Sequence, residues 1–344
     1  MTNENLPVIG VLGATGVVGR EILNILIEND VKYSEIKFLA SARSAGMTIK
    51  FKGKDYTIIE ATPDAFEGIN IVLASAGGAT SEALAAEAVK RGVVYIDNSS
   101  AFRMKEGVPL VIAGVNDEDL RTHKGIIANP NCSTSQLMLV LKPLDEYAKI
   151  KRLIVSTYQA VSGAGLAAIN ELTENTKANL VGSVYENTVF KHEIGFNVIP
   201  QIDAFTENGY TKEEMKVAHE TRKILHLDSS VPISCTAVRV PVYNGHSEAV
   251  TIEFEREITP QKTREILESA YGIEVVDDVA NFQYPTPKMA SGKDPVYVGR
   301  IRKSIAFDNA IDLFCVADNL RIGAALNTVR IAEKVIEMRL WGAR

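Results

Sequence analysis

Cysteine is scarce in this sequence, and its three cysteines, Cys132, Cys235 and Cys315, stand far apart. Three such residues cannot build a full disulfide framework, and they show none of the spacings that metal ligands use. We therefore expect no metal site, and the reducing cytoplasm is the compartment that suits this chain best.

Long apolar runs are missing as well. No stretch of about eighteen consecutive apolar residues occurs, so no segment is expected to span a membrane. Residues 1–7 are polar and acidic, without a basic region ahead of an apolar core. They do not resemble a secretion signal.

An excess of basic charge is the third absence. Lysine and arginine number 37 against 43 aspartates and glutamates, which gives a net charge of −6. Because no basic patch is interleaved with aromatic residues, nucleic-acid binding is not expected. An anionic substrate would have to be held by a few local cations, since the overall field mildly repels it.

The chain is nevertheless long enough for two domains, with 344 residues of which 46% are hydrophobic. Its first third alternates short apolar runs with amphipathic segments, which predicts a parallel sheet with helices on both faces. Strands are expected at 8–12, 36–40, 71–76, 93–97, 111–113 and 126–128, and helices at 16–28 and 81–91.

The pattern changes after Cys132. Segments 154–160, 235–242 and 249–255 alternate as the longer strands of an antiparallel sheet do, and Gly245 between the last two indicates a hairpin. Further helices are expected at 165–177, 212–225, 260–269 and 320–340, and the last of these could return to either domain.

A glycine-rich loop follows the first expected strand and opens the first expected helix. Gly13, Gly16 and Gly19 allow a tight turn, the close approach of a pyrophosphate and close packing of helix on strand. Glycines can also be plain turn residues. Placement between a strand and a helix favours a dinucleotide, whose phosphates the helix N-terminus would bind.

The end of the second expected strand bears on which dinucleotide this is. NAD sites usually end this strand with an acid for the ribose hydroxyls. Here the segment reads Ser41-Ala42-Arg43-Ser44, and Arg43 with the two serines could hold the 2′-phosphate of NADP. The alternative is that Arg43 is an ordinary solvated loop charge.

Cys132 lies in the turn Asn129-Pro130-Asn131-Cys132-Ser133-Thr134, between an expected strand and an expected helix. The N-terminus of a helix lowers the pKa of a thiol and favours the reactive thiolate. A lone cysteine is more often buried and inert, but the polar, turn-forming surroundings favour a nucleophile. A thiolate and a hydride carrier together predict conversion between an acyl group and an aldehyde.

Such chemistry needs a proton donor and acceptor, most often histidine. Among the five histidines, His246 stands apart because it lies in an expected loop between two strands, one of which carries Arg239. Loops supported by rigid strands commonly carry catalytic groups.

Taken together, these residues resemble the aspartate-semialdehyde dehydrogenase family. The matching segments run in the family's order over essentially the whole chain. They are 13–19 (GATGVVG), 41–46 (SARSAG), 129–133 (NPNCS), 159–165 (QAVSGAG), and RVP at 239–241 with HSE at 246–248.

The resemblance implies a role for each matching residue. Cys132 would carry the acyl thioester, His246 would be the acid/base, and Gln159 would position the substrate near the sulfur. Arg239 would clamp the substrate α-carboxylate with its planar guanidinium.

Other residues would contact the rest of the substrate and the cofactor. Glu213 would face the amino group, and Lys216, Arg103 and Asn131 would contact the phosphate, although Glu213 and Lys216 also read as an exposed helix pair. Cofactor contacts are expected at Gly13, Ala14, Thr15, Gly16, Val17, Val18, Ser41, Ala42, Arg43, Ser44, Ser162, Gly163 and Asn319.

The reaction implied by the resemblance is NADPH-dependent reduction of L-4-aspartyl phosphate to L-aspartate 4-semialdehyde, a step toward lysine, threonine, methionine and isoleucine. The implied α/β fold has a Rossmann-type NADP-binding domain at 1–131, completed by 318–344. An α+β catalytic and dimerisation domain with a mixed sheet would cover 132–317. A homodimer is expected, with a homotetramer as the alternative.

Two other functions are alternatives to this one. N-acetyl-γ-glutamyl-phosphate reductases share the chemistry, but that family usually has glycine before the cysteine and Tyr-Pro after it, where this chain has Asn131, Ser133 and Thr134. A nucleotide-sensing protein could keep the fold without the chemistry. The joint presence of Cys132 and His246 with Gln159 and Arg239 argues against it.

Overall fold

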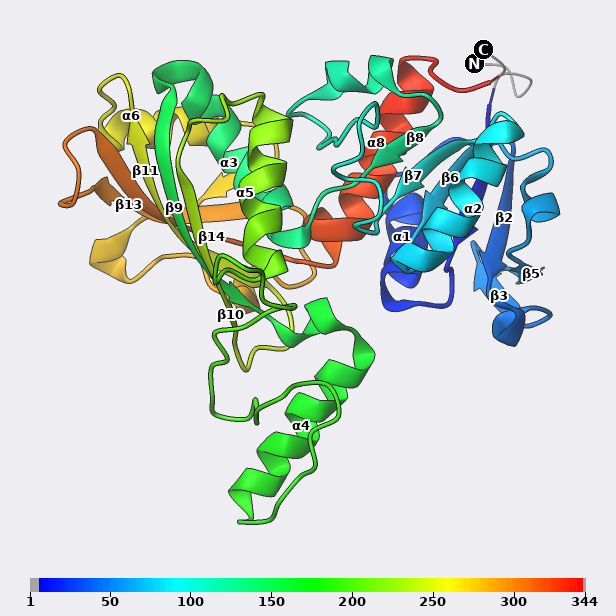
Figure 1. Cartoon of the computed structure of the whole chain (residues 1–344), viewed down its shortest axis with the longest axis horizontal. Coiled ribbons are helices and arrows are strands. Elements are labelled where there is room, and N and C mark those ends of the chain that lie inside the picture. Colours follow the sequence, from blue (N-terminus) through cyan, green and yellow to red (C-terminus); the bar gives the residue numbers. More distant parts are fainter. Residues whose placement is uncertain (1–5, 343–344) are drawn as a thin grey trace. The chain divides into compact units, whose positions relative to one another are not determined.

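The computed structural model describes residues 6–342 of the chain. Contacts between residues divide the chain into two compact units (Figure 1). The first unit contains the chain up to Asn131 and again from Ala324, and the second contains Cys132–Gly323. The expectation for residues 1–7 falls mostly outside the described range.

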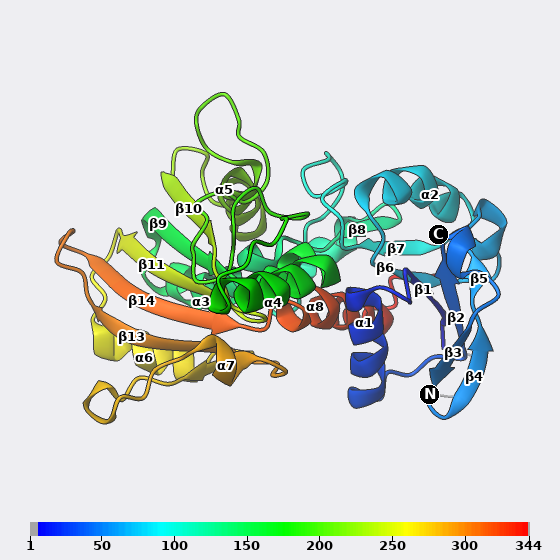
Figure 2. The ribbon, with the colours of Figure 1, turned by 90° about the horizontal axis from the view of Figure 1, so that it is seen from below.

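The first unit is built on a six-stranded parallel sheet, as the alternating sequence pattern predicts. Its strands are β1 (Val8–Leu12), β2 (Glu35–Ala40), β5 (Ile59–Glu60), β6 (Ile71–Ala74), β7 (Val94–Asp97) and β8 (Ile126–Ala128), and its helices are α1 (Val17–Glu28), α2 (Gly78–Lys90) and α8 (Leu326–Glu337). The order is β5-β2-β1-β6-β7-β8. Figure 2 shows α2 on one face and α1 with α8 on the other. The strands are apolar throughout because both faces of the sheet are covered. A separate hairpin pairs β3 (Thr48–Phe51) with β4 (Lys54–Thr57).

The expected strand at 111–113 is wrong. These residues are buried, but only Leu110 forms an isolated bridge, to Ala128. The Asn327 side chain instead accepts a hydrogen bond from the N–H of Ala113 and donates one to the carbonyl of Val111. A side chain from α8 thus satisfies the backbone groups that a strand would have paired.

The second unit is built on a mixed six-stranded sheet. Its strands are β9 (Ile150–Gln159), β10 (Ile233–Arg239), β11 (His246–Phe254), β12 (Ile273–Val275), β13 (Val296–Lys303) and β14 (Ala310–Ala317), and its helices are α3 (Cys132–Ala148), α4 (Leu166–Leu180), α5 (Lys212–Leu225), α6 (Pro260–Glu268) and α7 (Pro287–Ala290). The order is β10-β9-β11-β14-β13-β12. The β10–β9 and β12–β13 pairs are parallel, and the others are antiparallel. Helices α3, α5 and α6 pack against the sheet.

The expected hairpin around Gly245 is wrong, because β9 lies between β10 and β11. The connection crosses the end of β9 and bonds to the residues that follow that strand. Val161 and Ser162 donate their N–H groups to the carbonyls of Val242 and Tyr243. Gly245 does turn the chain, with φ +94, but into a strand that is not the neighbour of β10.

Strands β13 and β14 were not expected from the sequence. The pairing register between them shifts between Gly299 and Arg302, and Arg300 has a positive φ of +55. A bulge of this kind breaks the period of two that identifies a strand.

The expected helix at 320–340 divides into two parts. A π-helical turn occupies Arg321–Ala325, and α8 begins at Leu326. Residues 318–323 group with the second unit, where Asp318 accepts hydrogen bonds from Asn244 and Gly292. No helix within residues 6–342 is both long and apolar enough to cross a lipid bilayer.

Candidate active site

Cys132 is the first residue of α3, and its Sγ lies 3.2 Å from Nε2 of His246. The sequence turn thus places the thiol at a helix N-terminus, where the backbone N–H groups favour negative charge. The other two thiols differ in their surroundings. Cys235 and Cys315 are buried within the sheet, and burial raises the pKa of each above its ordinary value.

His246 lies at the start of β11, and the expectation that it stands in a loop is wrong. It is fully buried, and burial, followed by the charge of Arg239, holds its pKa well below the ordinary range. The backbone N–H of Ala160 donates to Nδ1 over 3.0 Å. The neutral ring therefore carries its proton on Nε2, the nitrogen that faces Cys132.

Arg239 ends β10 and is 5% exposed. Its Nη1 donates to the carbonyl of Ala160 over 2.7 Å, and burial lowers its pKa. Gly163 packs against this pair, since a Cβ there would lie 3.2 Å from both Arg239 Nη1 and His246 Nε2. A larger residue would push one of the two side chains aside.

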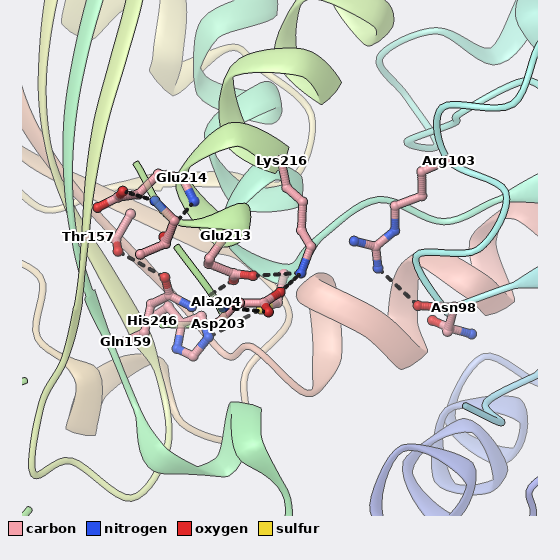
Figure 3. A network of polar contacts seen from close by, with 12 residues as sticks. Asn98, Arg103, Thr157, Gln159, Asp203, Ala204, Glu213, Glu214, Lys216 and His246 are labelled. Carbon is pink, nitrogen blue, oxygen red and sulfur yellow. Dashed lines mark hydrogen bonds and ion pairs between the residues drawn. The ribbon is translucent and has the colours of Figure 1, made fainter. Parts of the chain in front are cut away.

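Gln159, at the end of β9, is held on both sides (Figure 3). Its Oε1 accepts from Thr157 over 2.9 Å, and its Nε2 donates to Glu213 over 3.1 Å. Glu213 is 5% exposed, so the interpretation of Glu213 and Lys216 as an exposed helix pair is wrong for the acid.

Lys216 joins this network from the next turn of α5. Figure 3 shows its ammonium joined to both Glu213 and Asp203. The distances are 3.1 Å to Glu213 and 2.9 Å to Asp203. Burial works to lower the pKa of Lys216, but the two carboxylates outweigh it and the pKa is raised. Sequence reasoning missed Asp203, which stands in an irregular segment without a motif.

Ser162 and Asn319, both expected to contact the cofactor, are hydrogen-bonded to each other over 2.9 Å. Asn319 also accepts the N–H of Gly245. Asn244 donates to Asp318 over 2.6 Å. Asn244 and Asp318 had no signal in the sequence because their importance depends on contacts made across the fold.

Glu248 is a further buried group that sequence reasoning did not single out. It follows His246 by two residues on β11, so both side chains point to the same face of the sheet. Burial raises its pKa to about 8, although the Cys315 thiol and the Gln136 amide partly oppose this. Glu248 is therefore a neutral acid at neutral pH.

Arg103 and Asn131 belong to the first unit, and both are buried. Arg103 donates from Nε to the carbonyl of Asn129 over 2.9 Å and from Nη2 to that of Asn98 over 3.0 Å. These bonds fix its guanidinium at the ends of β7 and β8, the edge where parallel sheets bind ligands.

The glycine loop has the shape that a pyrophosphate requires. Gly13 has φ +81, and a Cβ at Gly19 would lie only 2.1 Å from the carbonyl oxygen of Gly13. Within the described residues no side chain caps α1 at Gly16, and its first turn has no acidic residue. The first N–H groups of α1 are thus available to an anion, so residues 13–18 fit a dinucleotide phosphate.

The expected nucleotide-selective segment follows β2 as a single 3₁₀ turn, η2 (Ala42–Ser44). Ser44 is buried, whereas Arg43 is exposed. The N–H of Gly13 donates to the carbonyl of Leu39, which joins the end of β2 to the glycine loop. Arg43 and the loop are therefore parts of one edge of the sheet.

Comparison of the sequence with protein-family models finds a match for each of the two units. Residues 8–123 match the model of the semialdehyde dehydrogenase NAD-binding domain, and residues 141–322 match that of the semialdehyde dehydrogenase dimerisation domain. The two halves together are those of a semialdehyde dehydrogenase.

Individual relatives are more specific. The aspartate-semialdehyde dehydrogenase of Aquifex aeolicus is 50% identical over 333 residues, covering 96% of this chain and 98% of that protein. A crystal structure of aspartate semialdehyde dehydrogenase II from Vibrio cholerae, complexed with ASA, is 43% identical with a TM-score of 0.93 over 96% of this chain and 98% of its own. The Candida albicans enzyme, solved with NADP, is 25% identical with a TM-score of 0.74 over 96% and 98% of the two chains. The chain belongs to the aspartate-semialdehyde dehydrogenase family.

Proposed function

We propose that this protein catalyses the NADPH-dependent reductive dephosphorylation of L-4-aspartyl phosphate, giving L-aspartate 4-semialdehyde and phosphate. The reaction belongs to the aspartate pathway toward lysine, threonine, methionine and isoleucine. The observation that carries the proposal is the Cys132 thiol 3.2 Å from a buried, neutral His246. A nucleophile paired in this way is the minimum that acyl transfer to an enzyme requires.

Cys132 attacks the acyl carbon of the substrate. The sulfur–carbon bond forms, the bond from carbon to the phosphate oxygen breaks, and a thioester remains on the enzyme. His246 is the hydrogen-bond donor of the pair, since its Nε2 proton faces the sulfur. It stabilises the thiolate and then the oxyanion that develops on the acyl carbon. The single proton consumed overall ends on the released phosphate.

The remaining polar groups hold the substrate. Arg239 pairs with the α-carboxylate, and Glu213 faces the amino group. Gln159, held by Thr157 and Glu213, positions the acyl group near the sulfur. Lys216, Arg103 and Asn131 contact the phosphate. A buried guanidinium is suited to a carboxylate because its planar donors match two oxygens and water does not weaken the pair.

The cofactor contacts are residues 13–18, residues 41–44, Ser162, Gly163 and Asn319. When bound, NADPH supplies the hydride that reduces the thioester to the aldehyde. The lack of an acid at the end of β2 and the exposed Arg43 support NADP over NAD. The Candida albicans relative, solved with NADP, supports the same choice.

The functional division follows the two units: residues 1–131 with the C-terminal helix bind NADP, and the central part carries catalysis and dimerisation. Within the described part of the chain, one face of the second sheet is only partly covered, by α7, and Ile154 and Tyr158 on it are 38% and 40% exposed. A hollow of about 370 Å³ indents this region, lined by Ala249, Tyr284, Pro285, Thr286, Pro287, Arg300, Arg302, Leu313 and Phe314. A second copy of the chain covers this face in a homodimer, with a homotetramer as the larger alternative.

The three free cysteines suit a cytoplasmic protein.

A single coupled assay tests the proposal. NADP reduction is followed with phosphate and either aspartate semialdehyde or N-acetylglutamate semialdehyde, and NAD is compared with NADP. Turnover with the first aldehyde and NADP is expected. Activity with the N-acetylated aldehyde alone would contradict the proposed substrate. A preference for NAD would contradict the interpretation that Arg43 binds the 2′-phosphate of NADP.

The nucleophile is tested in the same assay. Cys132→Ser should abolish turnover, because a hydroxyl is a far weaker nucleophile at neutral pH, while NADP binding measured by fluorescence titration persists. Cys235→Ser is the matched control: it changes a buried thiol in strand β10 and should retain turnover. Retained turnover in Cys132→Ser would rule out the thioester.

A further inference from the structure

Helix α4 binds the chain segment that follows it through hydrogen bonds to one buried carboxylate, that of Glu171. Figure 1 shows α4 projecting from the second unit with this segment running alongside it. Glu171, 1% exposed, accepts hydrogen bonds from the N–H groups of Thr188, Val189 and Phe190 over 2.6, 2.7 and 2.9 Å, and from the Thr188 hydroxyl over 2.9 Å. Burial acts to raise the pKa of Glu171, but these bonds outweigh it, so the carboxylate is ionised at neutral pH.

Phe190, the last of the three residues bonded to Glu171, contacts the active site. The ring of Phe190 lies with its centroid 5.9 Å from the guanidinium carbon of Arg239. A ring in this position attracts the cation and shields part of it from water. The same segment reaches Arg239 a second time, since Ile199 and Arg239 exchange two backbone hydrogen bonds of 2.9 and 2.8 Å.

The Arg239 side chain is otherwise fixed by its Nη1 bond to the carbonyl of Ala160. The Phe190 ring lies beside the same guanidinium. Glu171 fixes the backbone of Phe190, and the backbone of Phe190 in turn sets where its ring lies relative to Arg239. No motif in the sequence connects Glu171 with Arg239, which are 68 positions apart (239 − 171 = 68).

We propose that Glu171 and Phe190 are positioning residues that orient Arg239 and thereby set the affinity of the enzyme for the carboxylate of its substrate. The inference rests on the proposed function, in which Arg239 clamps that carboxylate. Neither residue touches the reacting carbon in this scheme. Their loss therefore weakens substrate binding more than it slows the chemical step.

The test compares KM with kcat for aspartate semialdehyde in Phe190→Leu, which keeps an apolar side chain but removes the ring, and in Glu171→Gln, which keeps the shape but removes the charge. Each should raise the KM for the aldehyde by about three- to tenfold, the range expected for a partly desolvated cation–π contact. The kcat and the KM values for phosphate and NADP should stay near those of the parent. Phe190→Tyr should restore the parent KM because it restores the ring.

Asn179→Ala is the matched control. Asn179 donates from α4 to the carbonyl of Gly195, so it holds the same segment at a point away from Phe190. Its KM should not change. If Asn179→Ala raises the KM as much as Phe190→Leu does, α4 and the segment after it support the site only in a general way, and the proposal is overturned.

Arg239→Lys separates this inference from the proposed function. If Arg239→Lys raises the KM for the aldehyde while Phe190→Leu and Glu171→Gln do not, only the positioning role fails. If Arg239→Lys leaves the KM unchanged, the carboxylate clamp itself is wrong. A parallel fall in kcat and rise in every KM in Phe190→Leu would mean a loss of structure, and would also overturn the positioning role.

Discussion

At the scale of single residues, the N–H of Ala160 decides the chemistry available to His246. By donating to Nδ1 it places the ring proton on Nε2, 3.2 Å from Cys132. Burial and the neighbouring Arg239 keep the ring neutral. The pair is therefore prepared to stabilise a thiolate and an oxyanion by hydrogen bonding, which is worth most in a site that excludes water.

Gly323 provides a prediction at this scale. It lies in the π-helical turn before α8, and a Cβ there would come 2.8 Å from Cβ and 3.1 Å from Cα of Cys132. Gly323→Ala should displace the Cys132 thiol, the proposed nucleophile, from His246 and lower kcat by about 100-fold, as a misplacement of about 1 Å does. The rate of alkylation of Cys132 by iodoacetamide should fall as well.

The control for this substitution is Gly78→Ala in α2, where the nearest atom to the new Cβ would be 3.9 Å away. It should leave kcat and alkylation unchanged and slightly stabilise the helix. Full activity in Gly323→Ala would show that the turn can move away from the thiol without consequence.

At the scale of elements, β11 carries two buried titratable side chains on one face, His246 and Glu248. Strand β11 pairs with β14 so that Glu248 stands opposite Cys315. The α3 helix packs over this face. The packing of α3 on this face thus excludes water from both side chains, which keeps His246 neutral and the Glu248 carboxyl protonated.

This burial predicts a pH-dependent stability. The pKa of Glu248 rises from 4.5 to about 8 on folding. As the pH rises above 4.5 the unfolded chain loses this proton while the folded chain keeps it, so the free energy of unfolding falls until the pH passes about 8. Glu248→Gln removes this loss. Its stability advantage over the parent should grow between about pH 5 and 8 in urea unfolding followed by circular dichroism.

The exposed Glu174→Gln of α4 serves as the control and should show no such trend. A constant difference between Glu248→Gln and the parent across this pH range would mean that Glu248 is ionised in the folded protein.

Several elements could be predicted from the sequence. Helix α5 begins and ends where the spacing of its apolar residues predicts, and β1 matches its apolar run. The order of the strands could not be predicted. The sequence gives no sign that β9 inserts between β10 and β11, because strand neighbours depend on contacts between distant segments. Strand β13 could not be predicted for a different reason, because the register shift between Gly299 and Arg302 breaks the alternation that identifies a strand.

At the scale of the whole molecule, one face of the second sheet stays partly uncovered within residues 6–342, since α7 packs only against its β14 part. Alternate residues of β9 point to α3 and to this face, and Tyr158 and Phe314 lie together on it with ring centroids 6.2 Å apart. Apolar surface of this kind on a sheet commonly marks an interface.

Tyr158→Asp tests this interface. A carboxylate in the middle of the proposed dimer interface would be desolvated without a partner, so we expect a dimeric parent and a monomeric variant. Light scattering after size-exclusion chromatography measures the mass. Tyr271→Asp, at a residue 54% exposed beyond α6, should leave the mass unchanged. A parent that is itself monomeric would refute the homodimer.

The sequence by itself determined the family and the doubly wound first unit, because short-range patterns record turns, helix starts and strand periods. The reactive residues, Cys132 and His246, stay a prediction that the assays above test. Only the tertiary structure decided that Nδ1 of His246 accepts a bond from Ala160, that Asp203 joins Lys216, and that Glu171 reaches Phe190. These contacts join residues far apart in the chain, and the free energy that selects them comes from burial and hydrogen bonding in the folded protein.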